Sequence, residues 1–168
     1  LDNTSDIKTK IKEASNFDLI LTVGGASIGK YDLITKSAIS LGLKLAFTSV
    51  AMRPGKPLLA GKLGNQIMIG LPGNPVSSLL CCQIMVKPVI EKMLGLDHAK
   101  KKLSIFAKLG TNLEKNGKRE HFQRALLKTV NNNFIVYPLH RQDYSLLTEL
   151  NRSNALIKRK PNAPALLS

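Results

Sequence analysis

A glycine-rich loop at residues 24–31 is the first segment whose residue types could do chemistry. Gly24, Gly29 and Lys30 match the phosphate-binding pattern G-x-x-x-x-G-K-[ST], in which the last position needs a small hydroxyl to bind magnesium. That position is Tyr31, and a phenol cannot replace the small hydroxyl, which argues against a nucleoside triphosphatase. The loop still favours an anion, because a glycine loop that enters a helix presents backbone N–H groups and the positive end of the helix dipole.

Two polar side chains lie in or directly beside this loop. Ser27 supplies a hydroxyl donor, and Asp32 is the one nearby acid. Next to bound phosphates an acid most usefully holds Mg²⁺. Asp32 could equally cap the helix that follows it, and spacing alone does not decide between the two roles.

Two later segments also carry residue types that suit an anion site. Arg53 and Lys56 lie three residues apart in R-P-G-K-P, where prolines stiffen the backbone and could hold both charges over one anion. Taken alone, this segment is better explained as a surface hairpin with solvated charges. Residues 72–77, P-G-N-P-V-S, join an apolar run to a helix that Asn74 and Ser77 could simply cap. Loops of this kind gather at the carboxyl edge of an open α/β sheet, so three of them in one short unit predict a pocket.

The residues around the first loop predict the elements that position it. Residues 6–14 have helical spacing, and residues 17–23 form a continuous apolar run typical of a parallel strand covered on both faces. A helix is predicted at 33–41, closed by Gly42, and a strand at 44–50. Strand, loop, helix and strand in this order predict a parallel sheet with a right-handed crossover.

Later elements complete an α/β domain and begin a second domain. Strands are predicted at 58–60 and 66–71, and a helix from Pro75 to about Met93 with a kink at Pro88. Beyond residue 98 the sequence predicts a small, mostly β domain. Its short strands are expected at 103–109, 122–130, 134–137 and 155–158. We therefore predict an incomplete α/β domain at 1–97, with a parallel or mixed sheet and helices on both faces, and a truncated β domain at 98–168.

Composition excludes several classes of protein. The chain has 168 residues, of which 43% are hydrophobic and 21% charged, which argues against disorder, and no apolar run is long enough for a membrane span. Cys81 and Cys82 are adjacent, which excludes a disulfide framework and fits a reducing, cytoplasmic compartment. The net charge of +14 raises nucleic acid as a partner, but aromatic residues are only 5% and no RNA-binding signature is present. The chain starts at Leu1 and stops within an apolar segment, so we interpret it as a fragment.

Together the three loops resemble those of the MoeA/gephyrin-E family of molybdopterin molybdenumtransferases. The matching segments are residues 22–32, 52–57 and 70–77, and residues 119–124 resemble a strand motif of the family's C-terminal β-barrel domain. The resemblance implies that molybdate is inserted into the dithiolene of adenylylated molybdopterin, with release of AMP and help from Mg²⁺. It also implies a homodimer and a partnership with the molybdopterin adenylyltransferase.

The resemblance also implies roles for individual residues. Asp32 matches the acid associated with metal and phosphate, and Arg53 matches a basic residue that lines the molybdate and pterin-phosphate pocket. Both are predicted catalytic residues, and Asp32 is the predicted metal ligand. The predicted substrate-binding residues are Gly24, Gly25, Ser27, Gly29, Lys56, Pro72, Gly73, Asn74, Pro75 and Ser77.

The chain departs from the family pattern in four places. Lys30 stands where an acid is common, Ser49 where some members have a second pocket lysine, and Asp143-Tyr144 where a Gly-Ser pair is usual. The family's two N-terminal domains and the first strand of its molybdopterin-binding domain are missing, so we expect little or no catalysis from this chain alone. The alternatives are adenylylation of molybdopterin on the related fold, a basic nucleic-acid-binding module, and a gephyrin-like scaffold.

Overall fold

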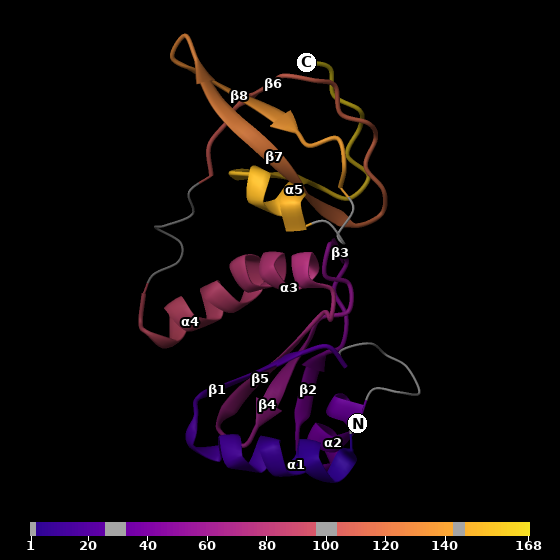
Figure 1. Ribbon diagram of the computed structural model, residues 1–168, viewed down its shortest axis with the longest axis vertical. Coiled ribbons are helices and arrows are strands. Elements are labelled where there is room, and N and C mark those ends of the chain that lie inside the picture. The colour runs from indigo at the N-terminus through magenta and orange to yellow at the C-terminus, as the bar shows by residue number, and fades with distance from the viewer. Residues whose placement is uncertain (1–2, 26–32, 97–103, 143–146) are drawn as a thin grey trace. The chain divides into compact units, whose positions relative to one another are not determined.

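The computed structural model describes residues 3–25, 33–96, 104–142 and 147–168 (Figure 1). The chain divides into two compact units, which are described one at a time. The first unit contains Leu1–Val50 and Gly55–Val86, and the second contains Ala51–Pro54 and Lys87–Ser168. The predicted boundary at residue 97 would place residues 51–54 and 87–97 in the first domain, whereas residues 51–54 and 87–97 belong to the second compact unit. The position of a domain boundary near residue 97 stays a prediction.

The first unit is built on a four-stranded mixed sheet with the order β1-β5-β4-β2. β1 (Leu19–Val23) pairs in parallel with β5 (Gln66–Leu71), whereas β4 (Leu59–Leu63) is antiparallel to both β5 and β2 (Lys44–Phe47). β1 and β2 therefore run in the same direction, as a strand–helix–strand unit predicts, but two strands lie between them. The parallel neighbour of β1 is β5, because the β4–β5 hairpin enters the sheet between β1 and β2.

One face of this sheet is covered by α1 (Thr4–Glu13) and α2 (Leu33–Ser40), with the short 3-10 turn η1 (Ala14–Asn16) between α1 and β1 (Figure 1). The core on this face consists of buried apolar side chains from α1, β1, α2, the turn after α2, and β5. They are Ile11, Ile20, Ala38, Leu43 and Met68. The apolar spacing of residues 6–14 is thus explained by burial of one helix face.

α2 ends at Gly42, as the sequence predicts. Gly42 has φ of +100°, its N–H donates to the carbonyl of Ile39 (2.9 Å), and the N–H of Leu43 donates to the carbonyl of Ala38 (2.9 Å). These two bonds are the Schellman arrangement, in which glycine adopts the left-handed conformation at low cost.

The predicted helix from Pro75 to Met93 is present in three consecutive pieces. They are α3 (Pro75–Cys81), the π-helical turn η2 (Cys82–Val86) and α4 (Lys87–Met93). Pro88 has no N–H to donate to the carbonyl one turn earlier, and the π turn ends at Val86, just before α4 begins at Lys87. The predicted irregularity at Pro88 therefore takes the form of a π turn.

The second unit is a five-stranded sheet around the long strand β7 (Glu120–Val130). β7 pairs in parallel with β3 (Met52–Arg53) and antiparallel with β8 (Asn133–Pro138) and β9 (Ala155–Arg159). β6 (Lys108–Leu109) pairs in parallel with β8, and α5 (Leu147–Arg152) precedes β9. Among the described residues the strand order is β3-β7-β8-β6, with β9 also paired to β7.

Two strand predictions were too long, and one helix was missed. The strand expected at 103–109 is reduced to β6, because Phe106 is fully exposed and residues 104–107 make no strand pairing. The strand expected at 44–50 ends at Phe47. α5 was not predicted. In the described segments, no helix is long and apolar enough to cross a membrane.

Candidate functional site

The loops that follow β1 and β5 lie side by side. The two strands are paired from Leu19 with Ile67 to Val23 with Leu71, so they end at the same edge of the sheet. The N–H of Gly24 donates to the carbonyl of Leu71 (3.1 Å) and extends this pairing by one residue. The glycine loops are therefore neighbours by strand register, as the sequence predicts for loops at a carboxyl edge.

Glycines allow the two backbones to approach each other. A Cβ built on Gly73 would lie 3.5 Å from the Cα of Gly24, and one built on Gly24 would lie 4.0 Å from the Cα of Gly73. Gly24 and Gly25 have φ of +83° and +64°, which side chains other than glycine rarely adopt. At Gly25 a Cβ would also lie 2.7 Å from Cδ1 of Ile34, so α2 leaves no room for a side chain there. The remaining predicted residues of this loop, Ser27, Gly29 and Asp32, lie outside the described residues.

The second loop, from Pro72 to Ser77, is fixed by helix capping. Asn74 is the N-cap of α3, and its Oδ1 accepts a hydrogen bond from the N–H of Ser77 (3.0 Å). Pro75 occupies the first helical turn, where its missing N–H costs nothing. The hydroxyl of Ser78 donates to the carbonyl of Pro72 and ties the start of the loop to the helix. The capping role that the sequence left open for Asn74 and Ser77 is therefore present, and a substrate-binding role stays a prediction.

The two cations of R-P-G-K-P fall into different units. Arg53 is in β3 of the second unit, where it pairs with His121 of β7. Lys56 is in the first unit, and its carbonyl accepts hydrogen bonds from the N–H groups of Val50 (3.1 Å) and Leu58 (3.0 Å). Its backbone thus shapes the turn. The side chain of Lys56 is exposed.

His121, Arg124 and Arg159 form a group of buried polar side chains that the sequence analysis did not single out as functional. Burial lowers the pKa of His121 to about 4, and the charges of Arg53, Arg119, Arg159 and Arg124 lower it further in that order. The imidazole is therefore neutral at neutral pH, in surroundings that are strongly cationic. The sequence offered no clear signal for the burial of these side chains, because β7 and β9 also contain other polar residues, such as Gln123 beside Arg124 and Lys158 beside Arg159.

Other candidate groups are not arranged for chemistry. Burial raises the pKa of the Cys81 thiol to about 11, with a smaller contribution from Cys82, so Cys81 is a protonated core residue. No cluster of three or more His, Cys, Asp or Glu side chains occurs within residues 3–25, 33–96, 104–142 and 147–168. A Mg²⁺ site at Asp32 therefore stays a prediction.

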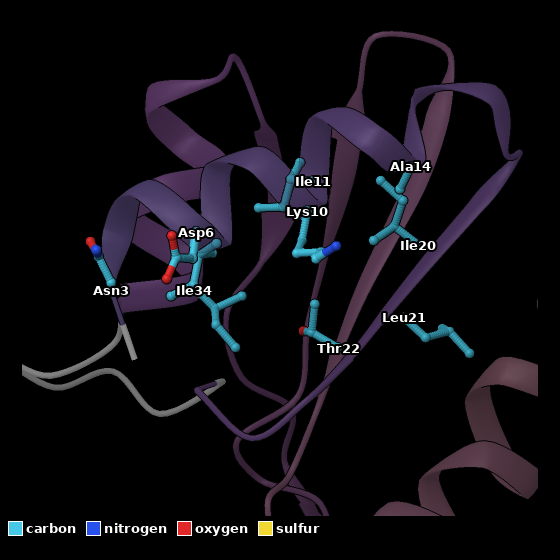
Figure 2. A pocket seen from close by; sticks show the side chains of 10 residues that line it. Asn3, Asp6, Lys10, Ile11, Ala14, Ile20, Leu21, Thr22 and Ile34 are labelled. Carbon is cyan, nitrogen blue, oxygen red and sulfur yellow. The ribbon is translucent and has the colours of Figure 1, made fainter. Parts of the chain in front are cut away.

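A cavity of about 410 Å³ lies between α1, β1 and α2 (Figure 2). Its lining is mainly apolar, with Asn3, Asp6 and Lys10 of the α1 segment and Thr22 of β1 as polar exceptions. The hydroxyl of Thr22 is buried without a hydrogen-bond partner. Among the described residues, none of the predicted site residues lines this cavity.

Comparison with known proteins identifies the family. A family model described as "Probable molybdopterin binding domain" matches residues 1–92, and one described as "MoeA C-terminal region (domain IV)" matches residues 107–166. The chain belongs to the MoeA family. Both matched segments agree with the predicted resemblance, and they together cover most of the chain.

Relatives of this MoeA-family chain are molybdopterin molybdenumtransferases. The chain is 40% identical over 124 residues to that of Haemophilus influenzae, covering 73% of this chain and 30% of the relative. It is 34% identical over 163 residues to that of Nostoc sp., covering 92% and 37% respectively. The chain therefore spans about a third of the length of these curated relatives.

The fold is also that of MoeA proteins. The crystal structure of the molybdopterin biosynthesis MoeA protein of Pyrococcus horikoshii OT3 matches with a TM-score of 0.75 at 21% identity, covering 99% of this chain and 37% of that one. A molybdenum cofactor biosynthesis protein of Pyrococcus furiosus matches with a TM-score of 0.73 at 19% identity, covering 99% and 52%. The mixed α/β fold class predicted from the sequence is confirmed.

Proposed function

We propose that this chain is part of a molybdopterin molybdenumtransferase, which inserts molybdate into adenylylated molybdopterin with release of AMP. The observation that carries the proposal is the approach of Gly24 to Gly73 at the ends of two paired parallel strands, in a chain of the MoeA family. Because the chain spans about a third of its curated relatives, we propose substrate binding for the chain itself and catalysis for a protein of the relatives' full length.

The glycine loops are proposed to hold the phosphate groups of the substrate. Without side chains, Gly24, Gly25 and Gly73 let an anion reach backbone N–H groups, which is how many phosphate sites are built. Pro72, Pro75 and the Asn74 cap keep the second loop rigid, which lowers the entropic cost of binding. Ser27, Gly29, Lys56 and Ser77 are proposed as further contacts.

Arg53 and Asp32 are proposed to balance the negative charge of the substrates, Arg53 directly and Asp32 by holding Mg²⁺. The guanidinium of Arg53 suits molybdate or a phosphate because its planar fork binds oxoanions through two N–H groups. Asp32 is the only acid between residues 24 and 32, and Mg²⁺ is commonly held by one carboxylate together with substrate phosphates and water. The proposed role of Asp32 is therefore to hold Mg²⁺, which would neutralise phosphate charge when it is bound.

The test is a fluorescence titration with adenylylated molybdopterin and Mg²⁺. Gly73→Ala is the informative variant, because its methyl group would meet Gly24 at an ordinary contact distance of 3.5 Å and leave the fold intact. We expect at least about tenfold weaker binding, since the methyl group keeps an anion from the backbone. Gly117→Ala is the matched control, because no atom lies within 4 Å of its new Cβ.

Equal affinities of Gly73→Ala and Gly117→Ala would contradict the proposed site. Asp32→Ala and Arg53→Ala are expected to weaken binding as well. ATP and duplex DNA serve as parallel titrants for the adenylylating and nucleic-acid-binding alternatives, which no described feature favours. A homodimer, a partnership with the molybdopterin adenylyltransferase and a cytoplasmic location are also proposed, and sedimentation of the full-length protein tests the first of these.

A further inference from the structure

An Asn-Gly pair connects two distant segments of the second unit. Asn116 and Gly117 are the one Asn-Gly pair of the sequence, and they lie a few residues before β7. The N–H of Asn116 donates to the carbonyl of Ala163 (2.9 Å), and the N–H of Asn162 donates to the carbonyl of Gly117 (2.8 Å). The backbone of the pair is therefore held by residues 160–163, which follow β9.

The side chain of Asn116 makes the same connection. Its Nδ2 donates to the carbonyls of Arg119 (2.9 Å), Arg159 (3.3 Å) and Lys160 (2.7 Å). Only a group with N–H or O–H donors can make these contacts, because all three partners are acceptors. The carboxamide of Asn116 thus ties the end of β9 to the turn before β7.

A glycine after an asparagine leaves the asparagine side chain open to attack by the backbone. The peptide nitrogen of the glycine can reach Cγ of the asparagine, because no side chain on the glycine hinders the approach. Asparagine is accordingly one of the thermolabile residues. Gly117 is exposed, and no atom lies within 4 Å of a Cβ built there, so the reacting atoms and water have room.

In the folded chain the hydrogen bonds of Asn116 oppose this reaction. Deamidation breaks the bond between Cγ and Nδ2, and Nδ2 is the atom that donates to three carbonyls. The backbone on both sides of the reacting atoms is also held, at the N–H of Asn116 and at the carbonyl of Gly117. The reaction therefore requires a local opening in which residues 160–163 move away.

We propose that Asn116 is a deamidation site that becomes reactive when residues 160–163 are released. The nitrogen of Gly117 forms a bond to Cγ of Asn116, the bond from Cγ to Nδ2 breaks, and ammonia leaves with the proton of the Gly117 nitrogen. Water then opens the cyclic imide at either of its carbonyls, which leaves aspartate or isoaspartate at position 116. The site does not depend on the proposed transferase function, because neither residue has a role there.

The product cannot restore the original connection. A carboxylate has no proton to donate at neutral pH, and it would face the three carbonyl oxygens that Nδ2 contacts. Lys118, Arg119 and Lys160 are exposed, so water and salt weaken their attraction to the new charge. We therefore expect residues 160–163 to stay detached once the reaction has occurred.

The rate of deamidation in the complete chain tests whether release controls the reaction. Peptide mapping by mass spectrometry follows conversion at Asn116 during incubation at mildly alkaline pH. Asn162→Pro removes the N–H that holds Gly117 and cannot adopt the φ of +56° found there, whereas Asn162→Gly keeps the N–H and adopts this φ freely. We expect at least about tenfold faster deamidation in Asn162→Pro and less than about a twofold change in Asn162→Gly, the matched control.

Gly117→Ala tests the chemistry separately from the fold. Its methyl group hinders attack by the peptide nitrogen, so in urea-unfolded chains it should deamidate at least about tenfold more slowly than the unsubstituted chain. Equal rates in these unfolded chains would overturn the proposed attack by Gly117. Equal rates in folded Asn162→Pro and Asn162→Gly would overturn the control by residues 160–163.

Asn116→Asp reproduces one product and tests its consequence. Hydrogen exchange at residues 155–163 should become about tenfold faster, because the donor to three carbonyls is lost. Asn112→Asp is the matched control, because Oδ1 of Asn112 only accepts, from the N–H (2.9 Å) and the hydroxyl (3.0 Å) of Ser168, and a carboxylate accepts the same bonds. Equal exchange in the two variants would show that added charge, and not the lost donor, acts on this segment, and would overturn the proposed detachment. If Asn162→Pro does not fold, this comparison and Gly117→Ala still decide the outcome.

Discussion

The two units of this chain differ in the side chains that they bury. In the first unit the core cluster is apolar, and the described part of the candidate site consists of the backbone at Gly24 and Gly73 and the Asn74 side chain that caps α3. In the second unit charged side chains enter the interior, with Arg124 completely buried and Arg159 nearly so. The core cluster of the first unit therefore contains no charged side chain, whereas the second unit holds two buried guanidinium groups.

The second unit also uses side-chain amides as substitutes for strand pairing. Gln142 accepts a hydrogen bond from the N–H of Arg124 (3.0 Å) and donates to its carbonyl (2.9 Å). Asn154 does the same with Leu127, at 2.7 Å and 3.0 Å. Unpaired polar groups are costly in such an interior, and Nε and Nη1 of Arg159 have no hydrogen-bond partner. We therefore expect the two units to respond differently to loss of core packing, to pH and to surface substitution.

The largest expected effect is the loss of core packing in the first unit. Met68 is completely buried among Ile11, Ile20, Ala38 and Leu43. Met68→Ala should lower the free energy of unfolding by about 2–5 kcal/mol, because it removes buried apolar contacts and leaves a cavity. Hydrogen exchange with mass spectrometry measures the protection of backbone amides in each unit separately. Protection should fall in β1 and β5 and stay unchanged in β7 and β8. An equal loss of protection in both units would show that they unfold together, and would contradict the distinction drawn between them.

The second effect is a pH dependence confined to the second unit. The pKa of His121 is lowered from 6.5 to about 4 by burial and by the neighbouring arginines. The unfolded chain thus binds a proton at a higher pH than the folded chain does, so stability falls as the pH drops from about 6.5 towards 4. Between pH 7 and pH 4.5 the loss should be about 2–3 kcal/mol, because one pKa unit corresponds to about 1.4 kcal/mol.

Urea titrations at these two pH values measure that loss, and His121→Gln should reduce it. The first unit contains no histidine, because His98, His121 and His140 all lie in the range of the second. A pH dependence that persists unchanged in His121→Gln would mean that other groups carry it. The electrostatic distinction between the units would then have a different origin.

A smaller effect is expected at the cap that shapes the second glycine loop. Asn74→Ala removes the acceptor for the N–H of Ser77 and should destabilise the first unit by about 1 kcal/mol. Asn74→Ser should recover most of the loss, because a hydroxyl also caps a helix well. Local hydrogen exchange at residues 76–79 reports the change. If alanine and serine behave alike, the loop is held by the Ser78–Pro72 contact instead.

The sequence was sufficient wherever a feature depends on neighbouring residues. The helix at 6–14, the end of α2 at Gly42 and the cap at Asn74 all follow from local spacing and residue type, and all are present. The positions of β1 and β5 follow from their apolar runs. The same local signals located the glycine loops, because a glycine or proline after an apolar strand marks the point where it ends.

Features that depend on the pairing of strands far apart in the sequence could not be predicted. β3 has only two residues and owes its place to Glu120 and His121, far along the chain. The insertion of the β4–β5 hairpin between β1 and β2 is likewise a property of the whole sheet. Buried His121 and buried Arg159 become neighbours only when β7 and β9 pair, so the pattern of a single strand gave no reason to connect these residues.

The smallest expected effect tests whether charge matters in the second unit only where it is buried. Lys158 is 59% exposed, pairs with Glu120 (3.2 Å) and lies 5.8 Å from the ring centre of Phe122. Lys158→Gln should change the free energy of unfolding by less than about 1 kcal/mol, because exposed ion pairs gain little over hydration and are screened by salt. Urea titration at low and high salt measures this, with Lys158→Arg as the charge-preserving control. A loss of stability as large as that expected from protonation of His121 would mean that exposed charges affect this sheet as much as buried ones do. The contrast between the two units would then depend on total charge and not on burial.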